Sequence, residues 1–227
     1  MILVSRPTCP RCQRPQPLCL CACISPQPSR TRVVVLQHTQ EARHALNTGR
    51  LAVLGLQNSE LLVGESFPDL EAMITAAPRA WLLFPGPEAQ PPQPLLCMDE
   101  VTVNTAEVIG SHRNALVSIR ETDQWATCEA PLLIVPDGTW RKARKIVQAN
   151  PVLHHLPRVC LDGGEPSRYR VRKTAEPNAV ATIEAIVRTL SILEPDNDFN
   201  AVLAPFERLI AQQISAMGPE IYRRHHS

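Results

Sequence analysis

The sequence predicts an α/β fold in which a mainly parallel sheet is flanked by helices. Three short apolar runs, residues 33–36, 80–84 and 131–135, have the length and composition of buried strands. Helical patterns follow the first and the third run, and a cysteine-rich segment precedes all three. Apolar runs that alternate with helical patterns are typical of parallel sheets, whose ligands bind at the carboxyl ends of the strands.

The first half of the chain contains two of these strands. Residues 5–30 hold five cysteines and six prolines, a composition that resists helix formation and supplies no hydrophobic core. The strand at 33–36 is followed by polar residues and by a predicted helix over 43–56. The strand at 80–84 cannot continue past Pro85, where a proline-rich loop begins.

The second half repeats the pattern. The strand at 131–135 ends at Pro136, and from Trp140 apolar residues recur at helical spacing while basic residues occupy the rest of the circumference. Thr139 is the predicted N-cap of this helix. A short strand over 158–161 and two amphipathic helices over 179–193 and 202–217 complete the prediction.

The composition excludes several classes of protein. Of 227 residues 44% are hydrophobic and 20% charged, which excludes a disordered chain. No apolar run approaches the roughly 20 residues that span a bilayer, and the N-terminus lacks the pattern of a signal peptide. We therefore expect a cytoplasmic protein with no membrane partner.

The net charge of +1 hides two basic blocks. Residues 1–50 carry +6, 51–136 carry −8, 137–173 carry +6 and 174–227 carry −3. Twenty of the 23 basic residues are arginine, whose planar guanidinium suits phosphate recognition. This segregation favours a nucleic-acid partner, with ordinary solvated surface charge as the alternative.

Five of the eight cysteines fall within fifteen residues. Cys9 and Cys12, followed by Cys19 and Cys21, fit a closed four-thiolate zinc site that is structural, because no coordination position stays open. Reduced, unliganded cysteines are the alternative, and Cys23 could replace Cys19 or Cys21. The isolated Cys97, Cys128 and Cys160 are expected to be small buried residues.

The string Asp137-Gly138-Thr139-Trp140 stands where a buried strand gives way to a helix with a basic flank. A carboxylate at the carboxyl end of a strand, beside a glycine that permits close backbone approach, is typical of α/β functional sites. The alternative is that Asp137 and Thr139 cap the helix while Trp140 packs in the core.

Together with this string, several further motifs resemble the DTW-domain family, which includes the tRNA-uridine aminocarboxypropyltransferases. They occur in the family's order over residues 9–185. They are the cysteine cluster, Gln37-His38 and Glu41, residues 47–52, the turn at 83–85, residues 137–145, residues 169–173 and Thr182 to Ala185. Thr39 and Ala181 depart from the family pattern, which usually has proline and serine there.

The resemblance implies a fold and an activity. The expected fold is a knotted, SPOUT-like catalytic domain over residues 30–227, preceded by a zinc-binding knuckle over residues 1–29, here called the Cys-rich module. The expected reaction transfers the 3-amino-3-carboxypropyl group of S-adenosylmethionine to N3 of a uridine in tRNA, usually in the variable loop, and releases 5′-methylthioadenosine. No GxGxxG fingerprint is present, in agreement with a cofactor site unlike that of Rossmann folds.

The resemblance also assigns roles to residues. Asp137, Thr139 and Trp140 are the catalytic candidates: Asp137 either accepts the N3 proton, positions the donor or only caps the helix, and Trp140 either stacks on a base or, as we prefer, packs in the core. His38, Glu41, Asn47 and Arg50 either bind substrate or brace their loop. The donor-binding candidates are Leu83, Phe84, Pro85, Val135, Pro136, Asp137, Gly138, Thr182 and Glu184. The RNA-binding candidates are Arg50, Arg141, Arg144, Lys145, Arg168, Arg170, Arg172 and Lys173.

Three other functions stay open at this stage. An aminocarboxypropyltransferase that acts on ribosomal RNA and a SPOUT-type RNA methyltransferase would both use S-adenosylmethionine. A non-catalytic zinc protein that binds RNA would need no polar residues at successive strand ends. No protein partner is implied, and the chain could be a monomer or a dimer.

Overall fold

The computed structural model describes residues 7–42, 44, 46–86, 88–95, 130–161, 167 and 180–218. Within them the chain forms a five-stranded sheet with the order β2-β1-β4-β3-β5, in which every neighbouring pair is parallel. The α/β class and the parallel sheet are therefore confirmed. The strands are β1 (Arg32–Gln37), β2 (Ser59–Val63), β3 (Ala80–Leu83), β4 (Leu132–Asp137) and β5 (Arg158–Val159).

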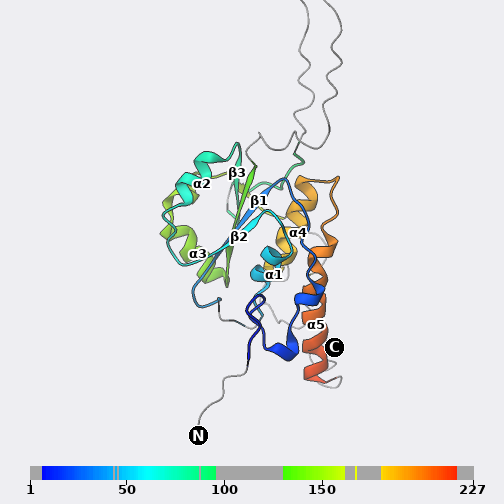
Figure 1. Cartoon of the computed structure of the whole chain (residues 1–227). Coiled ribbons are helices and arrows are strands. Elements are labelled where there is room, and N and C mark those ends of the chain that lie inside the picture. Colours follow the sequence, from blue (N-terminus) through cyan, green and yellow to red (C-terminus); the bar gives the residue numbers. More distant parts are fainter. Residues whose placement is uncertain are drawn as a thin grey trace, which may run out of the picture.

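Helices cover both faces of the sheet, as Figure 1 shows. One face packs against α1 (Thr48–Leu54), α4 (Thr182–Leu193) and α5 (Ala204–Met217), and the other against α2 (Leu70–Ala76) and α3 (Trp140–Ala149). The short 3-10 helices are η1 (Gln16–Leu18), η2 (Cys21–Cys23), η4 (Pro151–His155) and η5 (Asn200–Leu203). No described helix is long and apolar enough to cross a membrane.

Side chains of the central strands divide between two cores. Val33 and Val35 of β1 lie in the cluster that includes α1, α4 and α5, whereas Val34 and Leu36 lie in the cluster that includes α2 and α3. All four are fully buried. A strand covered on both faces has no position for a polar side chain, which explains the uninterrupted apolar run.

The structure contains two elements that the sequence analysis did not predict, β2 and α2. β2 lies at the edge of the sheet and none of its residues is fully buried. Glu60 in this strand pairs with Arg32 of β1, with 2.8 Å between Oε2 and Nη2. An edge strand that carries a charged residue lacks the apolar run by which the other strands were recognised.

The start of α1 also differs from the prediction. The helix begins at Thr48 rather than near residue 43, because Asn47 caps it and its Oδ1 accepts a hydrogen bond from the Arg50 amide at 2.9 Å. The last two helices begin at Thr182 and Ala204, a few residues later than predicted.

The Cys-rich module shares its core with the rest of the chain. Leu20 is fully buried in the same cluster as α4 and α5. The Arg14 side chain donates hydrogen bonds to the Leu18 carbonyl and, at 3.2 Å, to Oε1 of Gln212 in α5. The module is therefore anchored on α5 by both apolar and polar contacts.

The trefoil knot of the expected fold stays a prediction. It would involve the connection between β5 and α4, and most of that connection, residues 162–166 and 168–179, lies outside the described residues.

Candidate functional site

Asp137 is held by hydrogen bonds from two other elements at the carboxyl edge of the sheet. It is the last residue of β4 and only 7% exposed. Gln37, the last residue of β1, donates to its Oδ2 at 2.7 Å, and the Thr182 hydroxyl at the start of α4 donates to its Oδ1 at 2.5 Å. Because each carboxylate oxygen has its own donor, the orientation of the group is fixed.

The Gln37 amide is itself fixed by Asn47. The two side chains exchange hydrogen bonds, from Gln37 Nε2 to Asn47 Oδ1 at 2.8 Å and from Asn47 Nδ2 to Gln37 Oε1 at 2.9 Å. This pairing leaves Gln37 a donor toward Asp137. Asn47 therefore serves as both the helix cap and a brace for the site, the second of the two roles predicted for it.

Gly49 in the first turn of α1 completes the surroundings of Asp137. A Cβ atom at this position would lie 2.7 Å from Asp137 Oδ2 and 2.9 Å from its Cγ. Only a residue without a side chain allows α1 to approach the carboxylate this closely.

Gly138 is required at the turn from β4 to α3. Its φ of 151° disfavours other residues, and a Cβ atom would lie 3.1 Å from the Lys142 Cβ. Thr139 occupies the N-cap position, but its side chain makes no capping hydrogen bond.

The preferred interpretation of Trp140 as a core residue is wrong. The side chain is 41% exposed, and its ring meets only the edge of Phe84 within the described aromatic residues, with 5.9 Å between centroids. The helical spacing is confirmed, but Trp140 stands at the first position of α3, and the buried residues Ala143, Ile146 and Val147 follow it along the helix.

The other donor-binding candidates lie at two places, at the carboxyl ends of β3 and β4 and in the first turn of α4. Phe84, Val135 and Pro136 are buried at the ends of β3 and β4, with Leu83 half-buried and Pro85 exposed. Glu184 is 2% exposed and its Oε2 accepts the Ala181 amide at 2.9 Å and the Ser167 hydroxyl at 2.6 Å. In this structure Glu184 caps α4, as a glutamate at the third helical position often does.

Two further predicted residues make polar contacts that hold the segment after β1. Nε2 of the buried His38 lies 2.9 Å from Oε1 of Glu65, and Oε1 of Glu41 lies 2.7 Å from Nζ of Lys142. These contacts favour the bracing role for His38 and Glu41.

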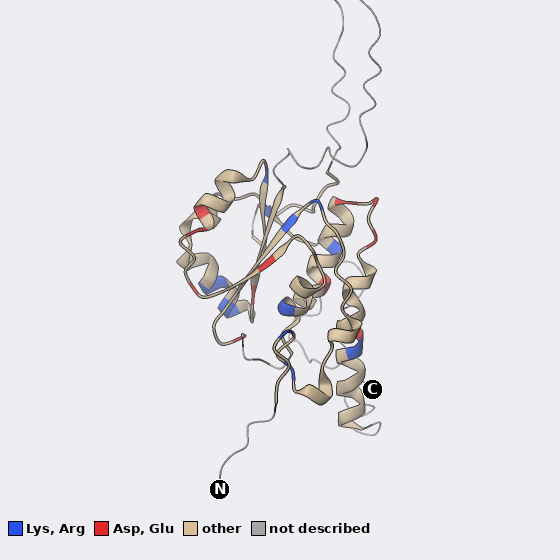
Figure 2. Cartoon of the chain, viewed as in Figure 1, with Lys and Arg blue, Asp and Glu red and all other residues tan. Residues whose placement is uncertain are grey.

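The basic residues of α3 face outward. Arg141, Arg144 and Lys145 are exposed, and the ribbon of α3 carries basic positions, coloured blue in Figure 2. Arg50 lies on α1. The candidates Arg168, Arg170, Arg172 and Lys173 lie outside the described residues.

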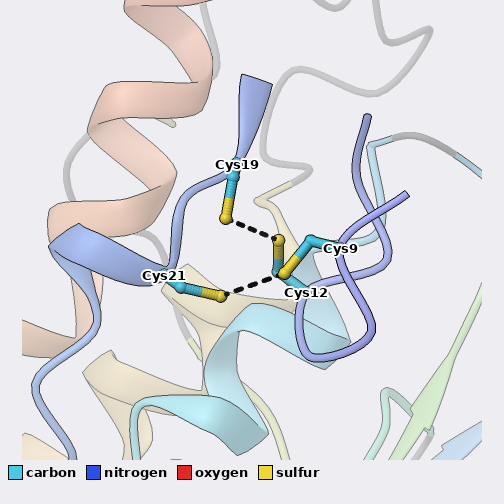
Figure 3. Close-up of side chains that lie close together, drawn as sticks. All are labelled: Cys9, Cys12, Cys19 and Cys21. Atoms are coloured by element: carbon cyan, nitrogen blue, oxygen red, sulfur yellow. Dashed lines mark hydrogen bonds between the residues drawn. The ribbon is translucent and has the colours of Figure 1, made fainter. Parts of the chain in front are cut away.

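The four predicted metal ligands gather at one point, as Figure 3 shows. The sulfur atoms of Cys9, Cys12, Cys19 and Cys21 all lie within 4.8 Å of one another, with 3.6 Å between Cys9 and Cys21 and 3.7 Å between Cys12 and Cys19. Tetrahedral zinc with Zn–S bonds of about 2.3 Å places its ligands about 3.8 Å apart. The geometry fits zinc, and it excludes Cys23 from the cluster.

The surroundings of these sulfur atoms differ. Backbone amides of Cys12 and Arg11 point at Cys9 and lower the pKa of its thiol to about 6, whereas burial and the neighbouring thiols raise the pKa of Cys21 to about 12. A divalent cation compensates the burial of the remaining thiolates. Cys160 is only half-buried, contrary to expectation, and Cys97 and Cys128 lie outside the described residues.

The profile of the DTW domain matches residues 6–214 of this chain, which includes the Cys-rich module, the Asp137 site and α4. The chain belongs to the DTW domain family. The chain is also similar, over most of its length, to three named proteins.

One is tRNA-uridine aminocarboxypropyltransferase A of Arabidopsis thaliana, which is 30% identical over 85% of this chain and 75% of its own length. Another is tRNA-uridine aminocarboxypropyltransferase 2 of Drosophila melanogaster, which is 26% identical over 92% of this chain and 76% of its own length. The protein of the latter name from Macaca fascicularis is 26% identical over 92% of this chain and 64% of its own length. No solved structure shows significant similarity to this DTW protein.

Proposed function

We propose that this DTW protein transfers the 3-amino-3-carboxypropyl group of S-adenosylmethionine to N3 of a uridine in the variable loop of tRNA, and that it acts in the cytoplasm. Relatives named tRNA-uridine aminocarboxypropyltransferase support the reaction. The observation that carries the proposal is the carboxylate of Asp137 at the carboxyl edge of the sheet. Gln37 and Thr182 hold it by hydrogen bonds, and Gly49 leaves room for it.

The reaction needs a deprotonated nitrogen and a fixed donor. The N3–H proton of uridine passes to a base, the N3 lone pair forms a bond to the terminal methylene carbon of the aminocarboxypropyl group, and the C–S bond breaks with its electrons moving to sulfur. The products are the modified uridine and neutral 5′-methylthioadenosine. Which of the carbons bound to sulfur is attacked depends on the orientation of the donor, so positioning selects the product.

Asp137 supplies one of two functions in this scheme. Its carboxylate either accepts the N3 proton or positions the ammonium, the ribose hydroxyls or the sulfonium of the donor. The hydrogen bonds from Gln37 and Thr182 support both roles, because either requires a carboxylate with a fixed direction. A role as a helix cap alone would not need donors from β1 and α4.

The neighbouring residues complete the proposed site. Loops at the ends of β3 and β4, formed by residues 83–85 and 135–138, and the entry to α4 at Thr182 hold the donor. Exposed Trp140 is placed to stack on the adenine or the target base. Glu184 fixes the first turn of α4, and Thr139 presents its backbone at the start of α3.

RNA and zinc bind outside this centre. The proposed phosphate contacts are Arg50, Arg141, Arg144, Lys145, Arg168, Arg170, Arg172 and Lys173. Structural zinc in the Cys-rich module, bound by Cys9, Cys12, Cys19 and Cys21, maintains a segment that contributes Leu20, among its described residues, to the shared core.

Incubation of the zinc-loaded protein with S-adenosylmethionine and unmodified tRNA tests the proposal. Mass spectrometry is expected to detect 5′-methylthioadenosine and a uridine that carries the aminocarboxypropyl group. S-adenosylhomocysteine would instead indicate a methyltransferase, turnover with ribosomal RNA alone would change the substrate, and binding without turnover would indicate a non-catalytic RNA-binding protein.

Gly49→Ala is expected to lower kcat about 100-fold with little loss of stability. The added methyl group would approach within 2.7 Å of Asp137 Oδ2 and must displace the carboxylate, and displacements of this size at a reacting centre have such effects. Steady-state kinetics and thermal unfolding measure the two quantities. Gly55→Ala, at the other end of α1 and next to Val202, is the control; equal activity of both variants would contradict the role of Gly49.

A further inference from the structure

A cavity of about 350 Å³ lies between the Cys-rich module and the beginning of α1. Residues between Thr8 and Arg14 form its wall on the module side, and His44, Asn47 and Arg50 line it from the body of the protein. No aspartate or glutamate is among the described residues that line it. The cavity therefore offers hydrogen-bond donors and cations without carboxylates.

The guanidinium of Arg50 faces this cavity without a bonding partner among the described residues. Its Nε is buried without a hydrogen bond, and its guanidinium forms no hydrogen bond or ion pair with any residue the structure describes. Burial lowers the pKa of Arg50, and the Cys12 thiol offsets this only in part. Arg50 is half-buried, and its buried Nε lacks a hydrogen-bond partner, so an anionic ligand in the cavity would supply one.

The zinc-bound thiolates are the alternative anionic partner for the positive charge of Arg50. Four thiolates on one zinc ion carry a formal charge of −2, and Cys9 and Cys12 line the same cavity. Arg14, also in the wall, donates hydrogen bonds to the Leu18 carbonyl and to Gln212. Arg50 makes no hydrogen bond to either sulfur, which leaves its donors available to a ligand in the cavity.

The cavity is connected to the candidate catalytic centre by one pair of side chains. Asn47 lines the cavity and exchanges hydrogen bonds with Gln37, which donates to Asp137. A nucleotide whose base reaches Asp137 would bring its sugar-phosphate backbone to this region, as happens when a base is extruded into a site.

We propose that this cavity binds a phosphodiester group of tRNA beside the target uridine, with Arg50 as its principal ligand and Gln13 and His44 as further donors. The Cys-rich module then forms part of the substrate site and does not only support the fold. The identity of the RNA rests on the proposed function, whereas the anion site does not.

Equilibrium binding of unmodified tRNA to the zinc-loaded full chain, without donor and over a series of KCl concentrations, tests this proposal. Arg50→Gln is expected to weaken binding about tenfold at low salt and to lower the slope of log K against log salt by about 1, with Arg50→Lys intermediate. Arg79→Gln is the matched control, because Arg79 is exposed and precedes β3. It therefore lies at the amino ends of the strands, opposite the carboxyl ends that carry Asp137. This variant is expected to bind like the parent.

Three results would overturn the proposal. An unchanged slope with loss of zinc from Arg50→Gln would make Arg50 the counter-ion of the thiolates. An unchanged slope with weakened equilibrium binding of S-adenosylmethionine, measured in a separate titration, would assign Arg50 to the donor carboxylate. Unchanged tRNA affinity, salt slope and zinc content would show that the cavity does not bind a tRNA phosphate. Because binding is measured without turnover, a protein that binds tRNA through Arg50 but transfers no group would refute only the proposed function.

Discussion

Asp137→Asn is expected to lower kcat about 1000-fold while the affinity for tRNA changes little. The affinity for S-adenosylmethionine is expected to persist if Asp137 is the base and to fall if it positions the donor. The loss follows from removing a charge that acts at the reacting atoms, by proton transfer or by electrostatic stabilisation. The asparagine can keep its oxygen toward the Gln37 donor, which Asn47 holds in place, and present its amide to the Thr182 hydroxyl. The fold around the site should therefore survive.

Asp69→Asn is the control for this variant. Asp69 is exposed before α2 and its side chain makes no capping hydrogen bond, so the same change of charge should leave kcat at the parent value. Single-turnover kinetics and equilibrium binding separate chemistry from affinity. Turnover by Asp137→Asn near the parent rate would remove Asp137 from the catalytic residues.

Removal of the metal is expected to give the largest loss of stability. Cys12→Ala should lose the bound zinc and about 4 kcal/mol of stability, which for a chain of this length lowers Tm by roughly 10 °C. Cys12 is one of the four sulfur ligands and only 4% exposed. The module that these ligands hold together contributes Leu20 to the shared core, so loss of the metal disturbs that core as well. Metal analysis and thermal unfolding measure the two effects.

Cys23→Ala is the matched control, because Cys23 lies in the same module but outside the cluster of sulfur atoms. It should retain one zinc ion per chain and the parent Tm. Loss of zinc from this variant, or retention of zinc by Cys12→Ala, would contradict the ligand assignment.

Since zinc binding releases protons from the cysteine thiols, acidification should release the metal from the parent protein.

The sequence predicts the strands that are buried on both faces, and the reason is physical. β1, β4 and β3 are the three interior strands of the sheet, so each reads as an apolar run. The edge strand β5 was also predicted, but as a longer strand over 158–161 than the two residues it contains. β2 carries Glu60 at the edge of the sheet and gives no such signal. The start of α1 depends on the Asn47 cap, a single polar side chain that the spacing of apolar residues does not reveal.

The candidate site was predictable only in part. Asp137 follows an apolar run and lies next to a glycine, which marks the carboxyl end of β4. Gln37 was not among the predicted site residues, because its role arises from the register that pairs it with Asp137, 100 residues away along the chain. A polar residue that ends a buried strand was the available signal. The exposure of Trp140 depends on where α3 begins relative to the sheet, which helical spacing does not contain.

The transfer of an isotopic label from the donor tests the central claim most directly. Zinc-loaded protein is supplied with unmodified tRNA and one of two forms of S-adenosylmethionine, labelled either in the methyl group or in the aminocarboxypropyl chain. The proposed reaction predicts that only the label of the aminocarboxypropyl chain enters uridine. Entry of the methyl label into the tRNA, with none from the chain, would contradict it.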